Sequence, residues 1–352
     1  MAAHWMVYGA NGYTGELIAR EAVARGLAPV LAGRSEGPVA AIAGELGLEH
    51  RTFDLADAAA VDTGLADIDL VLHCAGPFSA TSAPMIEGCL RAGAHYLDIT
   101  GEISVFEHAR TLDARAREAG VVVCPGVGFD VIPTDCTAAA LARALPDATH
   151  LRLGFDGGDF TLSPGTAKTL VELFGQGGRA RVAGQVVAVP QAWKRRRIDF
   201  GNGEKWAMTL PWGDVSTAFH STGIPNIEVY LPMPGPVIRV LRAGNGMRGL
   251  MNRPGVQRVL KRGVERFVKG PDAGARERSP SWVWGEVENA AGDRRVARVR
   301  TENGYSLTVT GALAVVGFLR ACTPAGGYQT PSSLIGPELV TALPGSSELV
   351  IS

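Results

Sequence analysis

The chain has 352 residues, of which 20% are charged, and a formal net charge of −1 at pH 7. This balance and its ordinary hydrophobic content indicate a soluble globular protein, long enough for two domains. The N-terminus carries no charged-then-apolar signal sequence, and the apolar run at 312–319 is too short to span a bilayer, so we exclude secretion and expect a cytoplasmic protein. The five cysteines form no metal-ligand spacing, so no metal site is expected.

The first motif follows a short apolar strand expected over residues 4–8. The stretch Gly9-Ala-Asn-Gly-Tyr-Thr-Gly15 places three glycines between this strand and a helix expected over 13–25. At such a turn the backbone must bend tightly and admit a phosphate, and a side chain would obstruct both. The motif therefore predicts the start of a dinucleotide-binding βαβ unit.

The second strand, expected over 28–32, is followed by Gly33-Arg34-Ser35. NAD enzymes usually have an acidic residue near this point, whereas Arg34 and Ser35 suit a 2′-phosphate, so NADP(H) is favoured over NAD(H). Arg34 as a solvated loop residue is the alternative. Residues 33–37 also match a nucleophile elbow, but no upstream stretch resembles an oxyanion-hole loop. Asp54, after the third strand, could approach the adenine or could simply form a turn.

Residues 1 to about 130 alternate strands and helices. We expect a doubly wound parallel sheet with strand order 3-2-1-4-5-6. The remaining strands of this region are expected over 50–53, 69–74, 94–98 and 120–124, and the remaining helices over 38–47, 82–92 and 104–118.

The second half reads as an α+β domain with a mainly antiparallel sheet. We expect helices over 135–145 and 308–322 and a hairpin joining 282–288 to 295–301. Further strands are expected over 149–156, 183–189, 194–200, 215–221 and 226–231. The predicted boundaries are an NADP-binding Rossmann domain at 1–130, a substrate domain at 131–324, and a C-terminal segment at 325–352.

Polar motifs follow the fourth, fifth and sixth strands: residues 73–78, 96–102 and 124–130. Ligands bind outside the carboxyl ends of strands in such a sheet, so acids there are candidates for acid–base work or substrate binding. Helix capping is the alternative for Glu102 and for Asp135, which lies near a helix start.

The same motifs, in the same order, carry a family resemblance. Gly-Ala-Asn-Gly-Tyr-Thr-Gly, Ala-Gly-Arg-Ser, Cys-Ala-Gly-Pro-Phe, Tyr-Leu-Asp-Ile-Thr-Gly-Glu and Pro-Gly-Val-Gly-Phe-Asp resemble the saccharopine dehydrogenase-like NADP-binding oxidoreductases, especially the branch that includes bacterial trans-acting enoyl reductases. The resemblance places Asp130 and Asp135 on the substrate side of the site, and it implies that the C-terminal segment, 325–352, folds back on the first domain. It also implies a set of NADP-binding residues: Gly9, Asn11, Gly12, Tyr13, Thr14, Gly15, Arg34 and Ser35, with Gly76, Pro77 and Phe78 near the nicotinamide.

The expected activity is NADPH-dependent reduction of an enoyl-type C=C bond in a small or acyl/polyketide-like substrate, and the expected substrates include acyl groups carried on CoA or on a carrier protein. Tyr96, Lys168 and His220 are the candidate proton donors, and Asp130 is the candidate catalytic acid. A saccharopine-type C=N reductase is an alternative, but it would need clustered cations for substrate carboxylates, and only Arg152 and Arg179 are scattered candidates. A non-catalytic NADP-binding sensor or scaffold is a further alternative. The Tyr-x-x-x-Lys pair of short-chain dehydrogenases is absent.

Residues 237–269 hold nine Lys or Arg and a single acid, Glu265. Within this segment, 256–268 has the apolar spacing of an amphipathic helix. A basic solvated surface explains the segment, and a docking face for an acidic partner or an anionic membrane is the functional alternative. Nucleic-acid binding is not expected, because no aromatic residues interleave the cations. We also expect a homo-oligomer.

Overall fold

The computed structural model describes residues 4–157, 177–247, 255 and 279–352. The chain forms two compact units. Unit 1 comprises Met1–Cys136 and Gly304–Pro344, and unit 2 comprises Thr137–Asn303 and Gly345–Ser352. The sequence boundaries place the helix near 308–322 in the second domain, whereas in the structure this helix, α14 (Gly304–Ala321), belongs to unit 1.

Unit 1 is built on a seven-stranded parallel sheet with the order β15-β6-β5-β4-β1-β2-β3. The strand order expected for the first six strands is therefore confirmed, and β15 adds a seventh, parallel to β6. Most of these strands are fully buried, as short apolar runs are when helices cover both faces of a sheet. The strands are β1 (Trp5–Tyr8), β2 (Val30–Gly33), β3 (His50–Thr52), β4 (Leu70–His73), β5 (His95–Asp98), β6 (Val122–Cys124) and β15 (Gly327–Tyr328).

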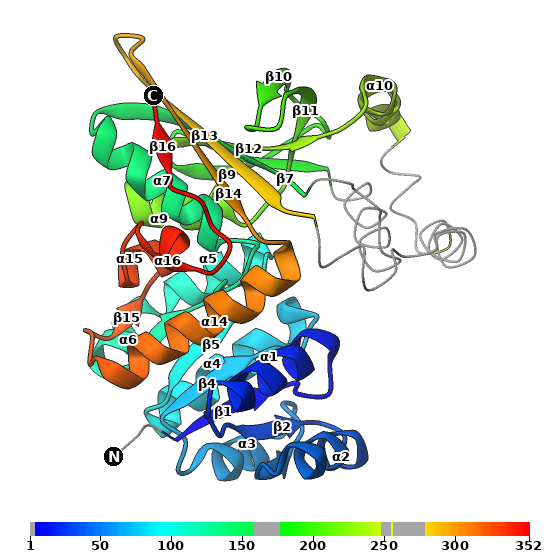
Figure 1. The fold of residues 1–352 in the computed structure, drawn as a ribbon, viewed down its shortest axis with the longest axis vertical. Helices are drawn as coiled ribbons and strands as arrows, with labels where there is room; N and C mark the ends of the chain where they lie inside the picture. Colours follow the sequence, from blue (N-terminus) through cyan, green and yellow to red (C-terminus); the bar gives the residue numbers. More distant parts are fainter. Residues whose placement is uncertain (1–3, 158–176, 248–254, 256–278) are drawn as a thin grey trace. The chain divides into compact units, whose positions relative to one another are not determined.

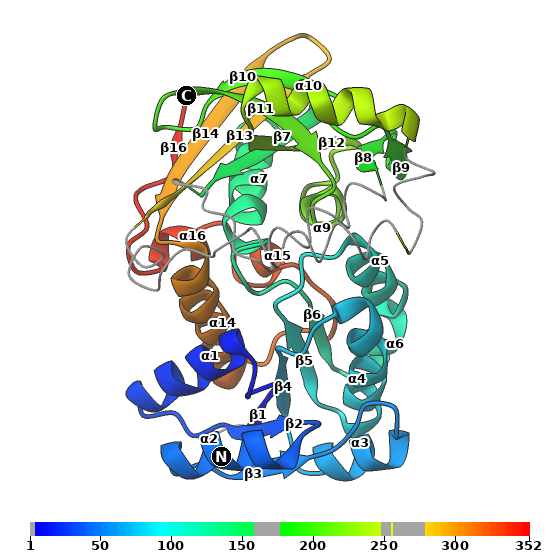
Figure 2. The same ribbon diagram turned by 90° about the vertical axis from the view of Figure 1, so that its right-hand side faces the viewer.

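Helices cover both faces of this sheet: α1 and α14 pack together on one face, and α3, α4 and α5 form a row on the other (Figure 2). Helix α3 was not predicted; the Asp57 carboxylate caps it by accepting N–H groups of Ala59 and Ala60. The helix predicted over 104–118 is broken at Leu112 into α5 and α6. The bounds are α1 (Tyr13–Ala24), α2 (Glu36–Leu46), α3 (Ala58–Leu65), α4 (Phe78–Ala92), α5 (Ile103–Thr111), α6 (Asp113–Glu118), α15 (Pro331–Leu334) and α16 (Leu339–Ala342).

The apolar run at 312–319 is too short to span a bilayer, but it is part of helix α14. The whole of α14 is long and apolar enough to cross a membrane, by length and composition alone. Within unit 1 it lies against α1, and eight of its 18 residues are buried. A buried apolar stripe is what a core helix needs, so packing in unit 1 accounts for its composition.

Unit 2 contains a mixed sheet with the order β10-β11-β12-β7-β13-β14-β16 (Figure 1). Strand β8 pairs with β12 beside this path, and β9 pairs with β8 (Figure 2). All pairs are antiparallel except β12 with β7, so the mainly antiparallel sheet is confirmed. The strands are β7 (Ala148–Asp156), β8 (Gly178–Val182), β9 (Gln185–Val189), β10 (Arg195–Asp199), β11 (Glu204–Leu210), β12 (Asn226–Pro232), β13 (Ser281–Asn289), β14 (Arg294–Thr301) and β16 (Val350–Ile351).

One face of this sheet packs on helix α7 (Ile132–Ala144), which runs from unit 1 into unit 2. A Cβ on Gly285 of β13 would lie 2.7 Å from Leu141 and 2.9 Å from Thr137, so the missing side chain lets the helix approach. Leu153, opposite Gly285 on β7, faces the same way, and Arg152 and Glu286 face the other side.

One predicted strand of unit 2 is wrong, and another is confirmed as β9 with a different first residue. Residues 215–221 form helix α9 (Asp214–Thr222), which packs on β12 and ends at Gly223 with φ 74°. Strand 183–189 begins too early, because residues 183 and 184 form the turn between β8 and β9. Strand β11 and helix α10 (Gly235–Ala243) were not predicted, and the helix expected over 256–268 lies outside the described residues.

Candidate cofactor and active site

Close backbone contacts shape the glycine turn after β1. Gly9 has φ 87°, in the left-handed region that glycine favours, and a Cβ there would lie 2.7 Å from the backbone nitrogen of Ala75. A Cβ on Gly15 would lie 2.3 Å from the carbonyl oxygen of Gly9. These glycines therefore let α1 begin directly against the ends of β1 and β4, as a phosphate-binding turn requires.

The N-terminus of α1 is open to a ligand. Its N-cap is Gly12, so no N-cap side chain occupies the first N–H groups of the helix. Asn11, Gly12 and Tyr13 are exposed, and Thr14 is half-buried in the same turn. Unpaired N–H groups at the positive end of a helix dipole suit a pyrophosphate, so this part of the structure fits the expected cofactor.

Arg34 and Ser35 follow β2, and both are exposed. Ser35 is the N-cap of α2 by position, but its hydroxyl makes no capping bond. In the described part of the chain, Arg34 forms no ion pair. The Asn11 side chain lies beside this strand end, because a Cβ on Gly33 would lie 3.1 Å from Asn11 Oδ1. An uncommitted guanidinium beside a hydroxyl fits a 2′-phosphate.

Tyr8 lies near the charges at this end of the sheet, and its hydroxyl donates to the carbonyl of Phe53 at 2.9 Å. Burial and the nearby Asp54 carboxylate raise the pKa of Tyr8 to about 12, and Arg34 opposes the rise. Asp54 is exposed, and its Oδ1 accepts the N–H of Ala56 at 2.9 Å. Asp54 therefore shapes the turn after β3, and its contact with adenine stays a prediction.

The loop after β4 is tied to the loop after β5. The peptide bond between Gly76 and Pro77 is cis, and α4 begins at Phe78. The Glu102 carboxylate accepts the N–H of Phe78 at 2.9 Å and that of Ser79 at 3.0 Å. The alternative that Glu102 caps the helix that follows it is wrong, because Glu102 makes no side-chain cap of α5 and instead caps α4.

Asp98, at the end of β5, is fully buried and accepts three hydrogen bonds. The Tyr96 hydroxyl donates at 2.7 Å, and the N–H groups of Thr100 and Gly126 donate at 2.9 and 2.8 Å. Burial raises the pKa of Asp98 to about 6 despite these donors. Tyr96 is also fully buried, and burial holds its pKa well above the usual value. Its hydroxyl is committed to Asp98, which does not suit a proton donor to substrate.

Asp130, after β6, lies directly against the loop that follows β5. A Cβ on Gly101 would lie 2.7 Å from Asp130 Oδ2, so only glycine leaves room for the carboxyl group. Burial raises the pKa of Asp130 to about 6. The contacts therefore gather Asp130, Glu102 and Phe78 at the carboxyl edge of the sheet, where the sequence placed the site. A carboxyl group with this pKa can exchange a proton near neutral pH.

The other predicted site residues are placed differently. Asp135 is fully buried in the first turn of α7, and its Oδ2 accepts the N–H of Ser332 at 2.8 Å, which anchors α15. The contact is with α15 and not with the helix in which Asp135 lies, so the expected capping of α7 and the expected substrate role of Asp135 both stay predictions. His220 lies on helix α9 of unit 2, half-buried beside the ring of Phe219, and not on a strand. Lys168 lies outside the described residues.

Sequence reasoning missed the contribution of α14 to this site. The ring of Tyr305 packs edge-on against Tyr13 with centroids 5.1 Å apart. The N–H of Phe129 donates to the Thr308 hydroxyl at 3.0 Å, and a Cβ on Gly128 would lie 3.0 Å from the Thr308 methyl group. The start of α14 therefore supports both the glycine turn and the loop that carries Asp130. No local signal indicated this, because the partners lie far apart in the sequence.

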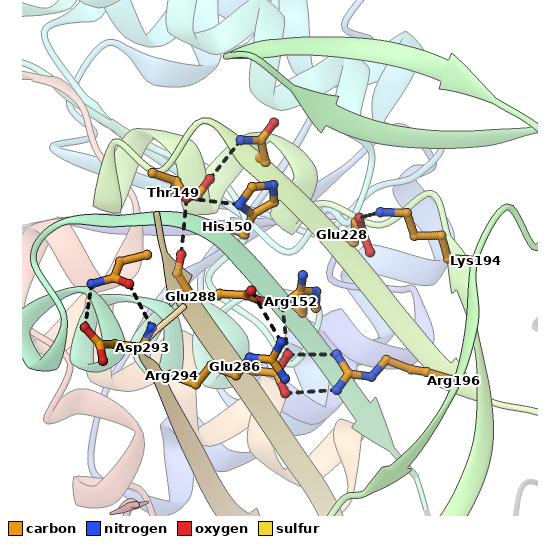
Figure 3. Close-up of polar contacts among 12 residues, drawn as sticks. Thr149, His150, Arg152, Lys194, Arg196, Glu228, Glu286, Glu288, Asp293 and Arg294 are labelled. Atoms are coloured by element: carbon orange, nitrogen blue, oxygen red, sulfur yellow. Dashed lines mark hydrogen bonds and ion pairs between the residues drawn. The ribbon is translucent and has the colours of Figure 1, made fainter. Parts of the chain in front are cut away.

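Unit 2 has an open pocket of about 390 Å³ on the sheet face opposite α7. Arg152 donates to Glu286 at 2.8 Å and to Glu288 at 2.9 Å (Figure 3). The two terminal guanidinium nitrogens of Arg196 each donate to one oxygen of the Glu286 carboxylate. Burial opposes the ionisation of Glu286, but Arg196 and Arg152 outweigh it and lower the pKa of this carboxyl. The pocket is lined by Arg152, Lys194, Arg195, Arg196, Glu228, Tyr230, Arg242, Glu286 and Arg294.

Comparison with known proteins agrees with this geometry. Residues 5–124 match the family model described as the saccharopine dehydrogenase NADP-binding domain, which covers the glycine turn and the first six strands. Residues 5–124 therefore form an NADP-binding domain of the saccharopine dehydrogenase type. The fold of the chain resembles that of apo saccharopine dehydrogenase (L-Glu forming) from Saccharomyces cerevisiae, with a TM-score of 0.67 over 99% of this chain and 100% of that one. At 11% identity, this likeness concerns the fold alone.

Relatives of this chain include a Mycobacterium tuberculosis protein provisionally named as a trans-acting enoyl reductase. It is 26% identical over 404 residues, covering 97% of this chain and 95% of the relative. A trans-acting enoyl reductase of Mycobacterium bovis is 30% identical over 153 residues, covering 41% of this chain and 37% of that protein. The human saccharopine dehydrogenase-like oxidoreductase is 28% identical over 152 residues, covering 38% and 35%.

Proposed function

We propose that this oxidoreductase uses NADPH to reduce the C=C bond of an enoyl-type acyl substrate. The observation that carries the cofactor assignment is the exposed Arg34–Ser35 pair after β2, which has no carboxylate partner in the described chain. The choice of C=C reduction is supported by the relative that matches nearly the whole chain, because that protein is named as an enoyl reductase.

The chain's own residues would bind the cofactor, orient the substrate and exchange protons with it. The open N-terminus of α1 would hold the pyrophosphate, and Arg34 the 2′-phosphate. When bound, NADPH supplies a hydride, which in enoyl reduction goes to the β-carbon, and a proton must reach the α-carbon. We assign that proton transfer to Asp130, which is half-buried after β6 and whose pKa burial raises to about 6. Asp98 has a similarly raised pKa, but it is fully buried and already accepts three hydrogen bonds.

Imine reduction of an amino-dicarboxylate is less well supported. Such a substrate needs cations free to bind its carboxylates. Arg152 already binds Glu286 and Glu288, and Arg179 donates to the backbone carbonyl of Gly178 at 3.0 Å. Neither guanidinium is therefore available to bind a substrate carboxylate, as the C=N reductase alternative requires. An apolar acyl chain needs no such partner.

The test is NADPH oxidation by the full chain with three substrate classes: enoyl thioesters, cyclic imines and α,β-unsaturated lactones. We expect turnover with enoyl thioesters, and an Asp130→Asn variant that still binds NADPH should lose at least tenfold in kcat. The matched control is Asp57→Asn, which changes the cap of α3 and leaves the strand-end acids in place. Turnover of imines alone would replace C=C by C=N reduction. Binding of NADPH without turnover of any class would favour the non-catalytic alternative.

A further inference from the structure

Helix α10 has an unusual exposed side. Its Ile238 and Leu241 are buried against Met208 and Ala192 in a small core of unit 2. One flank of the helix, beside this buried side, exposes Val240 to 71% and Val237 to 40%. Two exposed valines one turn apart form an apolar ridge on a helix that is already anchored by its inner side.

Strands β10 and β11 extend this surface. Trp206 of β11 is 42% exposed, and a Cβ on Gly235, at the start of α10, would lie 3.9 Å from its ring. Arg195 stacks over the Trp206 ring at 5.3 Å from the centroid, and Arg242 of α10 lines the same pocket as Arg195. Figures 1 and 2 both draw α10 beside β11. We call Arg195, Trp206, Val237, Arg239, Val240 and Arg242 the α10 face.

The α10 face carries uncompensated positive charge. Within the described residues, Arg195, Arg239 and Arg242 form no ion pair, although all three are exposed. The adjoining pocket adds to the excess, because its lining holds six cationic and two acidic side chains. An anionic partner could therefore bind these three arginines without breaking an ion pair of the described chain.

We propose that the α10 face docks unit 2 on a membrane surface rich in anionic phospholipids. Apolar side chains exposed among arginines, with a tryptophan at the edge, match the chemistry of the bilayer interface, where alkyl groups reach the acyl region and cations meet phosphates. An acidic protein would use the arginines but leaves the valine ridge unexplained. A helix of nine residues gives reversible attachment, because its apolar area is small and charge supplies much of the affinity. The inference does not depend on which bond the enzyme reduces.

The experiment is co-sedimentation of the full chain with vesicles of phosphatidylcholine alone and of equimolar phosphatidylcholine and phosphatidylglycerol. We expect binding only to the anionic vesicles, weakened by added salt. Val240→Asp should reduce the partition coefficient about tenfold, and Arg242→Glu roughly thirtyfold, because two charges change.

Matched controls lie on the opposite edge of the same sheet. Val350 of β16 is 62% exposed, so Val350→Asp introduces the same change away from the α10 face. Arg300→Glu on β14 is the control for Arg242→Glu. Controls should bind vesicles as the parent does, and all variants should keep the parent's melting temperature. The proposal is overturned by equal binding to both vesicles, by equal losses in test and control variants, or by no vesicle binding while an acidic acyl-carrier protein binds through Arg242.

Discussion

Arg34 offers the sharpest test of the cofactor site. Its side chain is exposed and has no carboxylate partner in the described chain, so Arg34→Ala should change the free energy of unfolding by less than about 0.5 kcal/mol. A charge-assisted hydrogen bond contributes about 1.5–3 kcal/mol, and solvent exposure favours the lower end of this range. The dissociation constant of NADPH should therefore rise about ten- to thirtyfold. That of NADH, which lacks the 2′-phosphate, should change less than about twofold.

The assay is a titration of each cofactor by calorimetry, with Arg25→Ala as the matched control. Arg25 follows α1 at its far end, where it pairs with Glu21, so its removal should leave both dissociation constants unchanged. Added salt should weaken NADPH binding more in the parent than in Arg34→Ala, because the variant has lost a screened charge contact. Equal weakening of NADPH and NADH by Arg34→Ala would refute the assignment, and so would an unchanged affinity for NADPH.

Three further predictions concern the same unit. Gly15→Ala places a Cβ 2.3 Å from a carbonyl oxygen and should weaken NADPH binding more than tenfold, whereas Gly44→Ala, in open space on α2, should slightly raise the melting temperature. Burial raises the pKa of Asp98 from 3.8 to about 6, so between these pH values the folded chain holds a proton that the unfolded chain has lost. The free energy of unfolding should therefore fall as pH rises from about 4 to 6. Urea denaturation of Asp98→Asn at several pH values should lack this part of the fall. Glu102→Ala removes the carboxylate that caps α4 and should lower the free energy of unfolding by about 1 kcal/mol, measured by urea denaturation, while an unchanged midpoint would contradict the capping role.

The first unit was largely predictable, because its signals are local. Each strand is a short apolar run, and right-handed crossovers leave few possible strand orders. The glycine turn and Arg34 could be interpreted from spacing alone. The partners of Tyr96 and Asp135 could not, since a hydroxyl that meets Asp98 and a carboxylate that meets Ser332 depend on packing.

The second unit was harder because its local preferences conflict with its packing. Residues 215–221 contain Val215 and Thr217, which favour a strand, yet Gly223 ends a helix there and the segment packs on β12. Strand β11 follows the polar turn around Gly203 and carries Glu204 and Lys205, so its apolar signal is confined to its second half.

The pairing of β15 with β6 has a consequence for synthesis on the ribosome. Residues 5–124 emerge early, but the edge of their sheet at β6 stays uncovered until Gly327 and Tyr328 have been made. The apolar side of α14 likewise reaches α1 only after Thr137–Asn303 of unit 2 has been translated. The nascent first unit therefore exposes a strand edge and apolar surface for most of translation, the condition under which chains pair with one another or recruit chaperones. Fragments that end before residue 328 should accumulate as aggregates.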